Sequence, residues 1–389
     1  MDDTKHLSAE MLYYMFESAN MHRWNDHYRT IDLTEIDKQA HKAAIAWYLG
    51  KCEERKGRSV NWHILIEHSL FAFIHRIAIT DLKPPVYYEL IKKEENRRAI
   101  NRYAYEQFSE RVPSMDRDFL ARFRAYIDEG SDLPEDHIVS AAHYLATRYE
   151  FNLIEEVNSS VIDIMETKKE IEDQLEGYRK YDLAGLSLPP EEDRKFQDFI
   201  KLVGQLRCQQ RWARIPREPK TTVLGHCIFV ANSVFLNDLD HGVTDARRIY
   251  NDYYSGLFHD LHEVLTKDVI TPVKSSSKDI TESLGDIEIM MFNKKVLPLM
   301  LDGHWVSELG NMALRPFEAV KGFDRDHESI KACDMLAAWI EAYVSIQYGV
   351  SSKMLRDAKV QTGYALIADP RGAKIGVSQI LSDFEKMSI

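Results

Sequence analysis

The sequence predicts an all-α protein. Apolar residues recur at three- and four-residue spacing along most of the 389-residue chain, which is typical of helices that bury one face. Alternation of apolar and polar residues over the length of a strand is nearly absent. The apolar fraction of 44% is large enough to fill a core, so the composition indicates a folded protein.

The helical periodicity is strongest in seven segments of the chain. These are residues 41–50, 60–79, 138–157, 222–237, 245–266, 283–301 and 328–347. A further helix, rich in charged residues, is predicted from Glu166 to Lys180.

A linker is predicted near the middle of the chain. Residues 181–193 combine a glycine, a Pro-Pro pair and several acidic residues, which is the composition of a loop. The chain is long enough for more than one domain. We therefore predict two domains of similar length, residues 1–185 and 186–389.

Charge and cysteine content narrow the class of protein. A formal net charge of -12 argues against a surface that binds a nucleic-acid polymer. The four cysteines have no paired spacing, so they read as reduced thiols of a cytoplasmic protein. The first residues are acidic and polar, unlike a signal peptide, and no apolar run approaches the roughly 20 residues that span a bilayer. We expect a cytoplasmic protein without a membrane partner.

Four residues of the second half have the character of metal ligands. His259 and Asp260 place a nitrogen ligand and an oxygen ligand side by side. His226 and Asp334 each interrupt an otherwise apolar helical segment, where a carboxylate is costly unless it is paired or bound to a metal. Singly, each could be a packed histidine or an exposed aspartate. The combination across three helices predicts a site for one divalent cation.

The residues around this set resemble a known family. Glu263-Val264-Leu265-Thr266 follows the His-Asp pair, Asp268 comes next, and Thr271-Pro272-Val273-Lys274 follows directly. Arg211-Trp212 precedes His226. This pattern resembles the HD-domain metal-dependent phosphohydrolases, and most closely their 5′-deoxynucleotidases. The resemblance implies a helical HD-domain bundle for the second half, and similar landmarks in the first half extend the prediction to two tandem HD-like units.

The resemblance also implies an activity. His226, His259, Asp260 and Asp334 would hold one transition metal, with manganese, cobalt and zinc as the expected range. The implied reaction is hydrolysis of a nucleotide phosphoester, foremost the removal of 5′-phosphate from deoxynucleoside monophosphates. Deoxynucleoside triphosphates or a signalling nucleotide, with a role in phage defence, are alternative substrates. The alternative without enzymatic activity is a scaffold that binds a nucleotide and does not cleave it. A homodimer is the expected assembly.

Five further residues receive roles by the same resemblance. Arg211 would receive the phosphate, since a guanidinium offers paired donors to its oxygens. Trp212 would form a wall near the sugar, and Lys274 would contact phosphate. Glu263 and Asp268 would transfer protons or orient water. Each has a plainer reading as a solvated charge or, for Trp212, as a packed side chain.

The first half carries a similar series of landmarks, which indicates an internal duplication. The pairs are Arg23-Trp24 with Arg211-Trp212, Arg29 with Arg217, His41 with His226, His75 with His259, and His143 with Asp334. Chance alignment of two helical stretches is the alternative. Arg76 follows His75 where an aspartate follows His259, and a guanidinium there would repel a metal ion. We therefore predict a degenerate HD-like domain without an intact metal site. It could support the fold, form a dimer interface, or bind a regulatory nucleotide through Arg23 and Arg29.

Overall fold

The computed structural model is helical, and it describes residues 4–79, 82, 84–266 and 278–389. The predicted all-α class is confirmed: among these residues, extended pairing is limited to isolated bridges. The helices are α1 (Ala9–Phe16), α2 (Glu35–Arg55), α3 (Trp62–Ala78), α4 (Pro84–Ile91), α5 (Glu94–Arg111), α6 (Arg117–Glu129), α7 (Pro134–Ile154), α8 (Ile164–Gly177), α9 (Pro190–Gly204), α10 (Val223–Asp240), α11 (Ala246–Phe258), α12 (Glu263–Thr266), α14 (Lys278–Lys295), α15 (Gly303–Leu314), α16 (His327–Gln347), α17 (Lys353–Ala368), α18 (Pro370–Lys374) and α19 (Val377–Lys386). In the part of the chain that is described, no helix is long and apolar enough to cross a bilayer.

Two of the predicted helices end earlier than their periodicity suggested. Segment 245–266 is divided into α11 and α12, because tight turns join the Leu261 N–H to the Phe258 carbonyl and the Glu263 N–H to the Asp260 carbonyl. Segment 283–301 is interrupted after α14, where Pro298 lies in a short 3₁₀ helix, Leu297–Leu299. A proline disfavours helical backbone at the residue before it.

Helices α2 and α10 lie at the centre of the molecule and cross closely. Each begins at a threonine whose hydroxyl accepts a backbone N–H three residues on, Thr34 from Asp37 and Thr222 from Gly225. Thr222 also donates a hydrogen bond to the Asp37 carboxylate, 2.5 Å away. A Cβ atom on Gly225 would lie 2.8 Å from that carboxylate. The crossing therefore requires a residue without a side chain.

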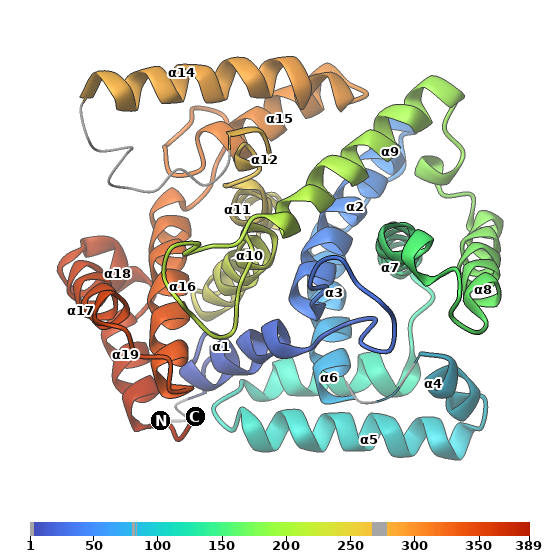
Figure 1. Cartoon of the computed structure of the whole chain (residues 1–389), viewed down its shortest axis with the longest axis horizontal. Helices are drawn as coiled ribbons and strands as arrows, with labels where there is room; N and C mark the ends of the chain where they lie inside the picture. Colours follow the sequence, from blue (N-terminus) through green and yellow to red (C-terminus); the bar gives the residue numbers. More distant parts are fainter. Residues whose placement is uncertain (1–3, 80–81, 83, 267–277) are drawn as a thin grey trace.

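One hydrophobic core runs through both halves of the chain. Figure 1 shows the helices of the two halves, with α2 of the first half beside α10 of the second. Helix α2 packs on α7 and on α10, and α10 packs in turn on α11 and α16. Trp47 of α2 is fully buried, and its indole N–H donates to the Tyr250 hydroxyl of α11 at 2.8 Å. Lys51 of α2 pairs with Glu308 of α15 at 2.9 Å. The two halves are thus joined by both apolar and polar contacts.

The segment predicted to be a linker lies against α2. Leu183 and Ala184 are buried, and the Ala184 N–H donates to the Glu53 carboxylate at 2.5 Å. A Cβ atom on Gly185 would meet Leu49 of α2. Residues 181–193 therefore connect the halves while packed against the first of them.

Candidate metal centre and phosphate site

The four predicted metal ligands meet in one place, brought there by three helices. His226 lies on α10, His259 and Asp260 follow the last turn of α11, and Asp334 lies on α16. His226 Nε2 is 3.1 Å from Asp334 Oδ1 and 3.9 Å from Asp260 Oδ2. His259 Nε2 is 3.1 Å from Asp260 Oδ2 and 3.9 Å from Asp334 Oδ1. Ligand atoms of His226, His259 and Asp260 all lie within 4.8 Å of one another, so they could share one ion.

The orientation of the His259 ring suits a metal ligand. Its Nδ1–H donates to the Gly256 carbonyl at 2.8 Å, so Nε2 faces Asp260 and Asp334, where a metal ion could replace its proton. Burial by itself lowers the pKa of His259, but the charge of Asp260 outweighs it and raises the pKa well above 6.5. A field that favours a proton at this point also favours a cation, so the donor set fits a divalent metal.

The two carboxylates are ionised and slightly accessible, while the imidazoles are enclosed. Burial disfavours their charge, yet the His259 ring holds the pKa of Asp260 below 3.8. Against the same cost of burial, the hydrogen bond with His226 and the charge of Lys331 hold the pKa of Asp334 well below 3.8. The carboxylate side chains are 17% and 16% exposed, against 0% and 1% for the imidazoles. A substrate would approach from the carboxylate side.

Arg211 is held beside this cluster by Glu341, a residue that the sequence analysis missed. Its Nε donates to both Glu341 oxygens at 3.2 Å, and its Nη1 lies 3.8 Å from Asp260. The Trp212 indole donates to the same carboxylate at 2.7 Å, and the Thr221 hydroxyl donates to it at 2.5 Å. Burial opposes the charge on Glu341, but Arg211 and Arg217 outweigh it and lower the pKa to about 2. One terminal nitrogen of Arg211 thereby lies beside Asp260, one of the predicted metal ligands.

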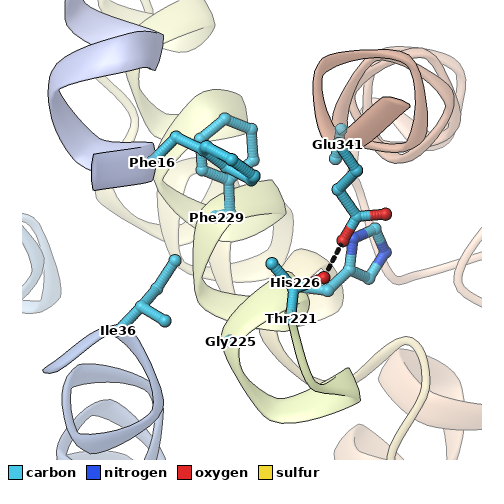
Figure 2. Close-up of a pocket in the computed structure, with 8 residues that line it drawn as sticks. Phe16, Ile36, Thr221, Gly225, His226, Phe229 and Glu341 are labelled. Atoms are coloured by element: carbon cyan, nitrogen blue, oxygen red, sulfur yellow. Dashed lines mark hydrogen bonds between the residues drawn. The ribbon is translucent and has the colours of Figure 1, made fainter. Parts of the chain in front are cut away.

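The spacing of Glu341 from Asp334 in the sequence could have indicated that it belongs to this cluster. It follows Asp334 by seven residues, which is two helical turns, so the two side chains share a face of α16. Figure 2 shows Glu341 reaching from α16 toward Thr221, next to His226. The cavity drawn there has a volume of about 10 Å³, with Ile36 and Phe229 among its lining residues. It has room for about one water molecule and not for a nucleotide.

Of the five residues with roles beyond metal binding, three are described. Arg211 and Trp212 are both half-buried and are held by Glu341 beside the predicted metal ligands. Glu263 begins α12, is 5% exposed, and its carbonyl accepts from the Gln209 side chain at 2.7 Å. Asp268 and Lys274 lie outside the described residues.

The first half repeats these contacts with other residues. Arg23 Nε and the Trp24 indole donate to Glu150 at 2.8 Å and 3.1 Å, as Arg211 and Trp212 do to Glu341. Both tryptophans have positive φ, 53° for Trp24 and 57° for Trp212. Matching antiparallel bridges join His22 to Thr34 and Gln210 to Thr222. This agreement supports an internal duplication.

The structure corrects one pairing in that duplication. His226 is the fourth residue after the N-cap Thr222, and the fourth residue after Thr34 is Lys38. Lys38 Nζ lies 3.2 Å from His143 Nε2, as His226 lies 3.1 Å from Asp334. Pairing His41 with His226 was therefore wrong. The His41 ring instead donates to the Ile200 carbonyl and accepts from Arg207.

Comparison with known proteins supports the resemblance of the second half to the 5′-deoxynucleotidases. Residues 198–367 match the family model described as 5′-deoxynucleotidase YfbR-like. A 5′-deoxynucleotidase of Pasteurella multocida is 24% identical over 175 residues, which are 43% of this chain and 84% of that protein. No solved structure matches the chain. At the level of family, these similarities support a nucleotide phosphohydrolase activity.

Proposed function

We propose that this chain is a metal-dependent phosphohydrolase that removes the 5′-phosphate from deoxynucleoside monophosphates. The convergence of His226, His259, Asp260 and Asp334 beside the guanidinium of Arg211 is the observation that carries the proposal. The similarity to 5′-deoxynucleotidases supports the class of substrate.

The proposed ligands are the two imidazole Nε2 atoms and one oxygen from each aspartate. Manganese, cobalt and zinc all accept such a mixed nitrogen and oxygen set. When bound, the metal would lower the pKa of water and neutralise charge on the phosphoryl oxygens.

The surrounding residues supply binding, orientation and proton transfer. Arg211 would bind the phosphate oxygens through its terminal nitrogens, since Glu341 occupies its Nε. Trp212, fixed through its indole N–H, would flank the sugar. Glu263 is proposed to hold or move a proton near the scissile bond, together with Asp268. Lys274 is proposed as a further phosphate contact.

The deciding experiment is a screen of nucleoside mono-, di- and triphosphates with added manganese or cobalt. We expect inorganic phosphate from deoxynucleoside monophosphates, and loss of both stoichiometric metal and activity, at least 1,000-fold, in His259→Ala. His304→Ala is the matched control, because His304 lies on α15 and its side chain is 65% exposed. Release of triphosphate from deoxynucleoside triphosphates would contradict the monophosphatase assignment and indicate a triphosphohydrolase. Absence of both metal and product would leave a binding scaffold.

A further inference from the structure

The first half contains a cluster of basic side chains where the second half has its metal ligands. Lys38 stands in the place of His226, Arg76 in the place of Asp260, and His143 in the place of Asp334. Lys38 is 1% exposed, and the side chains of Arg23 and Arg76 are 10% and 24% exposed. The cluster is therefore buried at its base and reachable from the surface at its rim.

The buried charges of this cluster do not balance. Four cationic side chains converge on His143, and each of them lowers its pKa in addition to the effect of burial. They are Arg23, Lys38, Lys42 and Arg76. Among the residues that the structure describes, two carboxylates pair with these cations, Glu35 and Glu150, and Glu150 is shared with the fully buried Arg207. Burying an excess of positive charge is costly unless an anion accompanies it.

Within the described part of the chain, Lys38, Lys42 and Arg76 make few or long hydrogen bonds. Of the three donors that an ammonium carries, the structure places one of Lys38 against His143 at 3.2 Å. Lys42 reaches the Ser69 carbonyl only at 3.5 Å, and Arg76 reaches Glu35 and the Leu82 carbonyl only at 3.5 Å. Burial lowers the pKa of Lys42 to about 8, and burial with the charge of Arg23 lowers the pKa of Lys38 well below 10.5. A bound anion in contact with Lys38 and Lys42 would raise both pKa values and accept further hydrogen bonds from them.

We infer that the first half holds a metal-independent binding site for a phosphate dianion, free or as the phosphate monoester of a nucleoside. With a phosphate in contact, Lys38 and Arg76 would supply two positive charges in place of a divalent cation, and Arg23 stands where Arg211 stands. No group at this site corresponds to a metal that activates water, so the site would bind a phosphate without cleaving it. Trp24 would flank a nucleoside, as Trp212 is proposed to do. The inference does not depend on the catalytic assignment of the second half.

The test is calorimetric titration of the full chain with inorganic phosphate and, separately, with 2′-deoxyadenosine 5′-monophosphate. Excess chelator removes metal from the second half, and Arg211→Gln serves as the background that removes its phosphate donor. We expect saturable binding in this background, weakened at least tenfold by the added change Lys38→Met or Arg76→Gln. Tighter binding of the monophosphate identifies a nucleotide ligand, and equal or tighter binding of inorganic phosphate identifies the free ion.

Two results would overturn the inference. One is absence of binding for both ligands in the presence of chelator. The other is binding that disappears with Arg211→Gln and survives Arg76→Gln, which would place the phosphate in the second half. If Lys38→Met fails to fold by circular dichroism, Arg76→Gln decides alone, because its partly exposed side chain is replaced by a neutral one. Failure of catalysis in the nucleotide screen leaves these outcomes unchanged.

Discussion

At the scale of single residues, Glu341 organises the approach to the candidate metal centre. It accepts hydrogen bonds from Arg211, Trp212 and Thr221. A buried carboxylate is tolerated here because cations surround it. The orientation of Arg211 toward Asp260 thus depends on a residue that would touch neither metal nor phosphate.

Replacing this carboxylate by the neutral amide in Glu341→Gln would therefore impair substrate binding. The amide turns an N–H toward donors that need an acceptor, at a cost of about 1–3 kcal/mol. We expect kcat/KM to fall about 10- to 100-fold, mostly through KM, with the metal content unchanged. Steady-state kinetics and metal analysis provide the measurement. Glu328→Gln, on the same helix with a 43% exposed side chain, is the matched control. Equal kinetics for the two variants would contradict the positioning role.

At the scale of elements, the ends of α10, α11 and α16 meet around buried acids. Asp238 of α10 is 2% exposed, and its buried Oδ2 has no hydrogen-bond partner among the described residues. Asp252 of α11 is fully buried and accepts the backbone N–H of Asp326, just before α16. Burial raises the pKa of Asp252 to about 7, and burial with the charge of Asp252 raises the pKa of Asp238 well above 3.8. The junction therefore holds protons that an unfolded chain would release.

This junction predicts a pH dependence of stability. Because the folded pKa values exceed the unfolded value near 3.8, the contribution of this junction to the free energy of unfolding falls as pH rises from about 4 to about 7. Asp238→Asn removes one such group, so we expect the slope of the free energy of unfolding against pH to become more positive by up to about 1.4 kcal/mol per pH unit. Urea unfolding at pH 5, 6 and 7 provides the measurement. Asp324→Asn, at a side chain that is 79% exposed, is the control. An unchanged slope in Asp238→Asn would show that the acid is not protonated in the fold.

At the scale of the whole molecule, the two halves depend on a shared core. Trp47 and Tyr48 of α2 contact aromatic rings of the second half, including Phe199, Phe258 and Trp305. Arg207, which follows α9, is fully buried against Glu150 of α7. Dividing the chain between residues 185 and 186 would expose these side chains on the surfaces of both fragments.

We therefore expect residues 186–389, expressed alone, to lack a cooperative unfolding transition. Each large apolar side chain that loses its cover costs about 2–3 kcal/mol, a large share of the stability of a domain. Calorimetry of this piece, of the full chain, and of the two pieces produced together provides the measurement. The full chain should unfold in one transition, and the paired pieces should regain it. A cooperative transition of residues 186–389 alone would establish an independent domain.

Sequence alone predicted the helical class and singled out the four residues that are proposed as metal ligands and that lie close together in the structure. Apolar periodicity is a local property, and His226 and Asp334 stand out because polar groups on apolar faces need a partner. The sequence-based pairing of His41 with His226 failed because spacing alone did not show where the first-half helix begins. The N-cap at Thr34 fixes that register and makes Lys38, three residues before His41, the counterpart of His226.

Tertiary structure decided the rest, because it depends on which side chains meet across helices. The division of segment 245–266 into two helices follows from turns that set His259 and Asp260 beside His226. The roles of Glu341 and Glu150 follow from donors more than a hundred residues away in the chain. The sequence thus determined the helices and the types of ligand, through interactions within a few turns. Only packing determined the register of the duplication, the direction of Arg211 and the cationic cluster of the first half, since these arise from long-range contacts and burial.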